Sequence, residues 1–220
     1  PFQVGTATGN GGNVAVDIWN STNTDVHLEV NVPQDSAVAS FNYYNGNSLI
    51  FDGVNDEVSI TGQATYQVSN ALTIESWVKP AVAPVDYDGF LSYAMNAGGM
   101  QAGFGFAFYL TGWRFFLKTT SPGQEINYSA MAETQLPVGQ WTHIAATFDG
   151  QEIKLYRNGA LMDSADAMGN VQWFGGPAEM VLGNFPKEGV NHFFNGQIDE
   201  VRLWNIVRTK DQLKASREIN

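Results

Sequence analysis

Hydrophobic and polar residues alternate along many short stretches of the chain, most clearly from Trp141 to Phe148. With a period of two, the odd-numbered residues of this stretch face one side of a β-strand and the even-numbered residues the other. Asp149-Gly150 and Asn158-Gly159 supply tight turns, and the segments QEIKLYR and ALMDSA that follow them alternate in the same way. The pattern therefore predicts a three-stranded antiparallel meander.

The same alternation recurs along the chain, and Gly, Asn, Asp or Pro separates nearly every pair of segments. It predicts further strands at 13–19, 25–32, 48–51, 57–60, 72–79, 89–95, 104–110, 113–119, 126–131, 178–184 and 196–205. One helix is predicted at 209–216, with Thr209 as its N-cap and Leu213 docking on the strands. The chain is therefore predicted to be all-β: an antiparallel two-sheet β-sandwich of the jelly-roll type with one short C-terminal helix.

The length of 220 residues suits one all-β domain spanning 1–220, with its core sandwich at 46–217. Residues 1–45 are polar and rich in Asn, and two interpretations of them stay open: N-terminal strands of the sandwich, or a looser extension. Because Pro1 is not a native start, we expect the chain to be a processed or excised part of a larger protein.

The charge balance excludes several classes of partner. The chain has 22 acidic and 11 basic residues, so it repels phosphate backbones and nucleic acid is not expected as a partner. No run of about 18 apolar residues occurs, so membrane insertion is not expected either. Cysteine is absent, which excludes disulfides and thiolate chemistry. Low charge with many Gly and aromatic residues is typical of an extracellular, secreted or cell-surface β-protein.

No catalytic residue is predicted. His143 lies inside a strand with no nucleophile or carboxylate nearby in the sequence, so we expect it to be a structural residue. Glycoside hydrolysis needs two carboxyl groups close together. Asp199 and Glu200 are adjacent and should face opposite sides of a sheet, while Glu75 stands alone. The chain is therefore predicted not to be an enzyme.

A calcium site is one interpretation of the turn FDGVNDE, which brings Asp52, Asn55 and Asp56 together. Calcium takes several oxygen ligands, and a Gly-containing turn supplies both carboxylate and carbonyl oxygens. An ordinary Asx turn without metal is the other interpretation, and spacing alone leaves both open.

Aromatic residues near loop ends are candidates for binding a glycan, because sugar rings stack on aromatic faces while polar neighbours fix the hydroxyl groups. We expect Trp113, Tyr109 and Trp173 to supply the rings, and Asp88 and Asn96 the hydrogen bonds. The two tryptophans are favoured for exposure because Thr-Gly precedes the first and Phe-Gly-Gly follows the second. The alternative is that such rings fill the core.

A family resemblance rests on an ordered set of segments: LIFDGVNDEVSI, ALTIESWVKP, GQWTHIAATFDGQEIKLYRNGAL, MVLGN and FFNGQIDEVRLWNIVRTKDQLKA. Together they resemble the laminin G-like, concanavalin A-like jelly roll, in the bacterial branch found in secreted multidomain proteins. The resemblance implies two antiparallel sheets, a structural role for the W-x-H strand, and a calcium ion that ties Asp52 and its neighbours to Asp199. The segment LGNFPKEG lacks the dense acidic run of the pentraxin relatives.

These observations lead to one functional prediction. We expect a non-catalytic carbohydrate-binding or adhesion module of a larger secreted or cell-surface protein, with a structural calcium ion. Its partners would be a glycan or polysaccharide and other domains of the same polypeptide. The alternatives are a polysaccharide hydrolase or lyase of the same fold, or a protein-binding or spacer domain.

Overall fold

The structure is a computed structural model, and it describes residues 48–215 except 62–66, 86, 94–101, 110, 122–123, 174–178 and 186–189. Within residues 1–47 it describes the backbone of four strands. The predicted ligand residue Asn96 lies outside the described residues.

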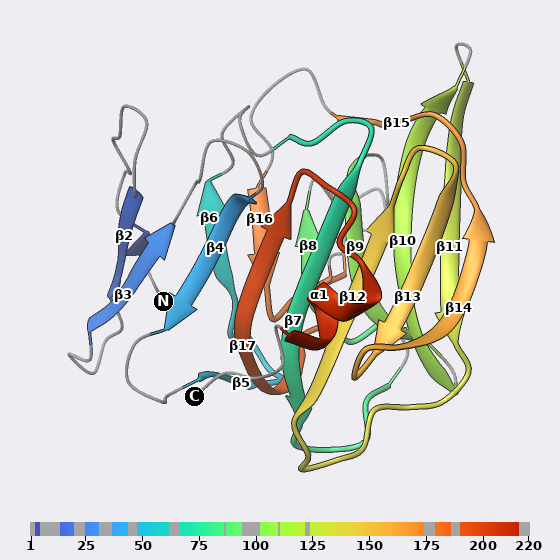
Figure 1. The fold of residues 1–220 in the computed structure, drawn as a ribbon. Helices are drawn as coiled ribbons and strands as arrows, with labels where there is room; N and C mark the ends of the chain where they lie inside the picture. The colour runs from blue at the N-terminus through green and yellow to red at the C-terminus, as the bar shows by residue number, and fades with distance from the viewer. Residues whose placement is uncertain are drawn as a thin grey trace.

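The described part of the chain is almost entirely β-structure (Figure 1). The first strands are β1 (Gln3–Val4), β2 (Val14–Trp19), β3 (Asp25–Val30), β4 (Ala37–Tyr43), β5 (Leu49–Asp52), β6 (Val58–Thr61), β7 (Leu72–Pro80), β8 (Gly89–Tyr93) and β9 (Phe104–Tyr109). The remaining elements are β10 (Gly112–Ser121), β11 (Gln124–Ala132), β12 (Thr142–Phe148), β13 (Glu152–Arg157), β14 (Ala160–Asp166), β15 (Asn170–Val171), β16 (Glu179–Leu182), β17 (Asn195–Trp204) and α1 (Lys210–Ala215).

The strands form two antiparallel sheets packed face to face, as predicted (Figure 1). The front sheet has the order β1-β2-β3-β4-β17-β7-β12-β13-β14, and β5 also pairs with β17. The back sheet has the order β11-β10-β9-β8-β16-β6, and β15 also pairs with β10. The backbone of β1 to β4 continues the front sheet beyond β17, in line with the first interpretation of residues 1–45. The division into domains stays a prediction.

The core lies between the sheets and is dense in phenylalanine. Phe90 contacts Phe106, Phe108 and Phe194 with ring centroids 5.3, 5.5 and 6.1 Å apart. All four side chains are completely buried. Because alternate residues of a strand face opposite sides, this core fixes which residues of each strand point outward.

The predicted meander and helix are confirmed in detail. Asn158 and Gly159 both have positive φ, 50° and 72°, as a two-residue hairpin turn requires. The Gln212 amide donates to Thr209 Oγ1 at 3.3 Å and the Thr209 amide donates to Gln212 Oε1 at 2.8 Å, which is a capping box. Leu213 packs on the outer side of the front sheet (Figure 1).

Each predicted strand has an observed counterpart whose ends differ by two residues or fewer. The strands that the pattern missed are β1, β4 and β15. Two of these contain only two residues each, too few for an alternation to be recognised.

Candidate functional site

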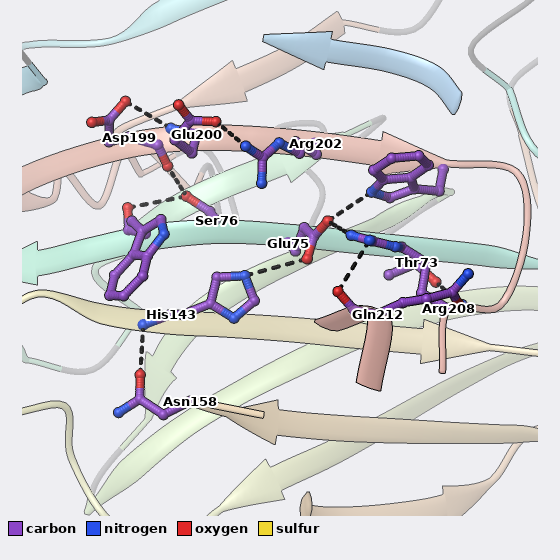
Figure 2. A network of polar contacts seen from close by, with 12 residues as sticks. Thr73, Glu75, Ser76, His143, Asn158, Asp199, Glu200, Arg202, Arg208 and Gln212 are labelled. Carbon is purple, nitrogen blue, oxygen red and sulfur yellow. Dashed lines mark hydrogen bonds and ion pairs between the residues drawn. The ribbon is translucent and has the colours of Figure 1, made fainter. Parts of the chain in front are cut away.

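A buried polar network lies on the outer side of the front sheet, beneath the segment that leads into α1 (Figure 2). Glu75 on β7 is completely buried. Its Oε1 accepts a hydrogen bond from Trp204 Nε1 at 2.8 Å and also forms an ion pair with Arg208. Its Oε2 lies 3.3 Å from Nε2 of His143 on β12. The network therefore joins β7, β12, β17 and the connection to α1.

The electrostatics of this network favour an ionised Glu75. Burial alone would raise the pKa of its carboxyl group, but the contact with His143 and the positive charge of Arg208 hold the pKa below its ordinary value of 4.5. His143 is 1% exposed, so a substrate does not reach it. The sequence did not reveal that His143 has a carboxylate partner, because Glu75 lies on the neighbouring strand β7 and is distant in sequence.

Asp199 and Glu200 form an irregular point on β17 beside this network. The pairing register with β7 shifts between Asp199 and Arg202, and Glu200 has a φ of +51°. Asp199 pairs opposite Trp77, and Glu200 forms an ion pair with Arg202, which pairs opposite Glu75. Both acids therefore belong to the outer side, and the prediction that they face opposite sides is wrong because the bulge breaks the alternation. Burial raises the pKa of both carboxyl groups, although Arg202 opposes this.

The turn predicted as a calcium site is an Asx turn. Asp52 Oδ1 accepts from the amides of Val54 (2.7 Å) and Asn55 (3.4 Å), and Asp56 Oδ2 accepts from the Asp52 amide (3.0 Å). These bonds account for the turn without a cation.

Asp199 does not come to this turn. Asn195, not Asp199, pairs opposite Asp52. Asp199 lies four residues after Asn195 on β17, which corresponds to about 13 Å of extended strand. Within the described residues, no three His, Cys, Asp or Glu side chains group as metal ligands do. The predicted set of Asp52, Asn55, Asp56 and Asp199 therefore does not fit one calcium ion, and calcium binding itself stays a prediction.

The outer side of the back sheet carries a cluster of aromatic side chains around one arginine. We call it the aromatic face and define it by Tyr87, Tyr109, Arg114, Phe116, Phe185 and His192. On β10, alternation puts Trp113, Phe115 and Leu117 into the core, all completely buried. Arg114 and Phe116 therefore point outward, where both are partly exposed.

Small residues on β9 make room for this cluster. Arg114 pairs opposite Ala107, and Phe116 pairs opposite Gly105. A Cβ atom at Gly105 would lie 3.2 Å from the Phe185 ring, so this ring rests directly over the β9 backbone. The Phe116 and Phe185 ring centroids are 5.4 Å apart.

Arg114 lies over two aromatic rings. Its Cζ lies 3.9 Å from the centroid of Tyr109 and 5.4 Å from that of Phe116. Its Nη2 donates to the Met131 sulfur at 3.3 Å. The guanidinium is thereby held by cation–π contacts and a thioether.

Tyr87 closes the cluster from a strained backbone position. Its φ is +68°, which is uncommon for a residue with a side chain and costs on the order of 1–3 kcal/mol. Its ring contacts Tyr109 at 5.6 Å, His192 at 5.7 Å and Phe185 at 6.4 Å. Backbone strain maintained by surrounding contacts is a frequent property of ligand sites, so Tyr87 marks this surface as the candidate functional site.

The loop that carries His192 is fixed by a buried asparagine. Asn184 is 2% exposed, and its Oδ1 accepts from the His192 amide at 3.0 Å. Its Nδ2 donates to Glu57 (2.8 Å) and to Asn191 (3.1 Å). The His192 carbonyl in turn accepts from the Gly89 and Phe185 amides, so the aromatic face is braced from below.

Comparison with known families decides the identity of the fold. Residues 51–214 match the laminin G-like family described as the concanavalin A-like lectin/glucanases superfamily. The chain belongs to this superfamily. The matched range of this concanavalin A-like domain includes all six residues of the aromatic face.

The curated relatives are much longer proteins. The domain is similar to Pappalysin-1 of Mus musculus, with 33% identity over 109 residues, which is 47% of this chain and 6% of that protein. The human Pappalysin-1 matches at 31% identity over a stretch of the same length. The chain thus spans a small part of the curated relatives that it matches.

Solved structures show the same fold at low sequence identity. A native heptameric SAP-like pentraxin from Limulus polyphemus has a TM-score of 0.52 and 16% identity, covering 75% of this chain and 78% of the pentraxin. The CBM40 of a Ruminococcus gnavus IT-sialidase, bound to α2,3-sialyllactose, has a TM-score of 0.53 and 19% identity, covering 79% of this chain and 100% of that module. The neighbours of this domain thus include carbohydrate-binding modules and pentraxins.

The structure separates the predicted ligand residues of this concanavalin A-like domain. Tyr109 lies on the aromatic face, and Asp88 lies beside it, where burial raises its pKa against the opposing effects of the Val85 amide and His192. The prediction that Trp113 is exposed is wrong, because its side chain is completely buried on the core side of β10. Asn96, the fifth residue predicted to bind the ligand, lies outside the described residues.

Trp173 is the other tryptophan that we expected to be exposed. It is half-buried and packs on Tyr93 with ring centroids 4.7 Å apart. Its Nε1 donates to the Val68 carbonyl at 2.8 Å. The ring therefore packs on the core rather than standing free. The binding roles of the remaining candidates stay predictions.

Five residues of the aromatic face were missed: Tyr87, Arg114, Phe116, Phe185 and His192. One signal for them was present in GFGFAFY, where Phe alternates with Gly, Ala and Tyr. The small residues form one side of that strand and indicate the surface on which other side chains lie. In the part of the chain that the structure describes, no helix has the length and hydropathy required to cross a bilayer.

Proposed function

We propose that this domain is a non-catalytic carbohydrate-binding module that acts outside the cell as part of a larger protein. The observation that carries the proposal is the aromatic face, where the Arg114 guanidinium lies over the partly exposed rings of Tyr109 and Phe116, and the partly exposed ring of Tyr87 contacts Tyr109. Partly exposed aromatic rings on a rigid sheet are suited to stacking against the C–H faces of a sugar.

The rigidity of this surface supports the proposal. Arg114 and Phe116 belong to β10, paired on both sides by β9 and β11. Binding to a preformed surface avoids the cost of ordering loops. A single small site of this kind has an expected Kd of about 10⁻³ to 10⁻⁵ M, and several copies in one polypeptide would raise the apparent affinity.

Binding without turnover is part of the proposal. Glycoside hydrolysis needs two carboxyl groups aimed at one bond, about 5 to 10 Å apart. The six residues that define the aromatic face include no carboxyl group, and Asp88 beside it supplies one where two are needed. His143 and Glu75, which have the chemistry of an acid–base pair, are enclosed on the other sheet.

The experiment is a glycan panel with matched variants. The wild type, Tyr109→Ala and Phe116→Ala are titrated with oligosaccharides by calorimetry, and the polysaccharide samples are analysed for released products. The control is Trp141→Ala, which removes a 38%-exposed ring just before β12 of the front sheet, over which Lys79 lies. We expect each variant of the aromatic face to weaken binding about fivefold or more, since an aromatic contact contributes about 1 kcal/mol.

The outcomes separate the alternatives. Binding that survives both variants of the aromatic face would place the glycan site elsewhere. Absence of binding to the whole panel would refute the proposal and favour a protein-binding or spacer role. Release of products would identify a hydrolase or lyase of the same fold.

A further inference from the structure

The charge at the centre of the aromatic face lacks an acidic partner. Among the described residues, no carboxylate forms an ion pair with Arg114. Arg202 and Arg208 each pair with a glutamate, and Lys118, which follows Arg114 on the same side of β10, pairs with Glu125 at 2.7 Å. Arg157 is the other described arginine without an ion pair, but it donates to the Thr134 hydroxyl, whereas the hydrogen bond of Arg114 goes to a thioether sulfur.

The polar contacts that Arg114 does make are weak ones. A guanidinium carries five N–H donors, whereas a thioether sulfur is a weak acceptor. Nη2 donates to the Met131 sulfur, and Nε is enclosed without a hydrogen-bond partner. An enclosed donor without a partner is costly, and a charged donor more so. Because Nε is enclosed, an external acceptor can reach only the terminal nitrogens of the partly exposed Arg114 side chain, and for these the described residues supply no oxygen acceptor.

The stacking geometry limits the shape of that acceptor. The guanidinium lies 3.9 Å from the Tyr109 ring centroid, so this ring covers one of its faces. Donors of a stacked guanidinium point outward in its plane, where a carboxylate binds them with two parallel hydrogen bonds. Phe116 lies beside the guanidinium and Tyr87 packs on Tyr109, so both rings are near enough to supply apolar faces for the rest of a sugar.

We infer that the ligand of the aromatic face is an acidic sugar, whose carboxylate accepts hydrogen bonds from Arg114 while its ring stacks on the neighbouring aromatic side chains. The inference rests on the proposed carbohydrate-binding function and narrows it to one chemical class. The net charge of −11 opposes the approach of anions from a distance. Selection for the carboxylate therefore arises from direct contact at Arg114, not from the overall field of the protein.

The first test compares ligands on the wild-type protein. Tri-galacturonate is titrated against its methyl ester, which has the same skeleton without the charges, and 3′-sialyllactose is titrated against lactose. We expect the acidic member of each pair to bind about tenfold more tightly, which is the effect of one charge-assisted hydrogen-bonded contact. A third ligand, 3′-sulfolactose, tests whether any anion suffices. Preference for the sulfate over both carboxylates would overturn the inference.

The second test uses Arg114→Met, which keeps the length and apolar contacts of the side chain, and Arg114→Lys, which keeps the charge without the paired donors. The control is Arg157→Met, because Arg157 lies on β13 of the front sheet and contacts Thr134. Arg114→Met should bind the acidic and neutral ligands equally, Arg114→Lys should keep part of the preference, and the control should keep all of it. Melting curves establish that each variant is folded.

The results distinguish this inference from the proposed function. Equal binding of acidic and neutral sugars by the wild type, abolished by Tyr109→Ala, would overturn the inference and leave the carbohydrate-binding function standing. Absence of binding to every ligand would overturn both. An acidic preference that persists in Arg114→Met would assign the carboxylate to another residue and overturn the role given to Arg114. The ligand pairs need no variant, so the inference is testable even if the substitutions fail to fold.

Discussion

Replacing Glu75 by glutamine removes a buried charge on which three elements of the front sheet converge. The Glu75 carboxylate is completely buried, accepts from Trp204 Nε1 at 2.8 Å, and is ion-paired with Arg208 and in contact with His143 (Figure 2). Glutamine has the same shape and keeps one oxygen acceptor, so the variant tests the charge and not the packing. Without the carboxylate, Arg208 is left in a site where its side chain is only 12% exposed.

The size of the effect follows from this burial. Removing one partner of a buried ion pair costs about 3–5 kcal/mol, because the other charge stays enclosed. We expect Glu75→Gln to lower the free energy of unfolding by about 3 kcal/mol, the lower end of this range. The effect is smaller because glutamine keeps an oxygen acceptor for Trp204 and because Arg208 is partly exposed. For a domain of this size, about 1 kcal/mol lowers the melting temperature by about 2–4 °C. The melting temperature of Glu75→Gln should therefore fall by about 6–12 °C.

The assay is thermal unfolding followed by circular dichroism at several pH values. Folding lowers the pKa of Glu75 below 4.5. The ionised carboxylate therefore contributes fully to the stability of the fold above pH 4.5, and this contribution is lost as the pH falls through the pKa of the folded state. The difference between the wild type and Glu75→Gln should thus shrink below pH 4.5. The control is Glu152→Gln, which removes an exposed ion pair with Lys154 and should leave the melting temperature unchanged. A Glu75→Gln variant that melts with the wild type at pH 7 would refute the reasoning.

Other substitutions test the remaining features. Trp113→Ala should destabilise the domain by about 3–5 kcal/mol through the cavity it leaves, while the folded fraction keeps its glycan affinity, as unfolding and binding titrations would show. Gly89→Ala puts a Cβ atom 1.8 Å from Cβ of Phe185, so it should lower both the melting temperature and the glycan affinity. Because burial raises the pKa of Asp199, Asp199→Asn should melt above the wild type at pH 7, and the gap should close as the pH falls toward 3.8. Calcium binding stays a prediction: if the domain holds a structural calcium ion, EDTA should lower the melting temperature and added calcium should restore it, whereas an unchanged melting temperature would count against the ion.

The strands were predictable because alternation reports directly on a half-buried strand. The meander of β12, β13 and β14 shows this most clearly, since its turns also have a sequence signature. Asn158-Gly159 adopts the positive φ angles that the dipeptide favours. The N-cap of α1 was predictable for the same reason, because the hydrogen bonds that Thr209 makes there go to residue 212, three positions away. Features made by neighbours in sequence can be predicted from sequence.

The buried network was not predictable, because its members are distant in sequence. Glu75 appeared isolated and His143 appeared to lack a carboxylate, yet the antiparallel pairing of β7 with β12 puts them in contact. Alternation also failed at Asp199 and Glu200, where a bulge with φ of +51° changes the direction of the side chains. A bulge depends on the partner strand, and the segment itself does not reveal it.

Predicting the aromatic face needs both the local alternation of residues and the pairing of neighbouring strands. The segment WRFF has aromatic residues on both sides of β10, so alternation alone does not say whether Trp113 or Phe116 faces the core. The neighbouring strand decides it: Phe104, Phe106 and Phe108 fill the core side of β9. The side of β10 that pairs across from them must then also be the core side, which buries Trp113.

The outer side of β9 follows from the same register. It carries Gly105 and Ala107, although glycine weakens a strand and leaves backbone uncovered. This cost is offset where another side chain rests on the backbone, as the Phe185 ring does over Gly105, and where space is needed beside Arg114. In a sheet with a phenylalanine core, the small residues opposite the aromatic ones therefore indicate the candidate functional surface better than the large aromatic residues, most of which are needed inside.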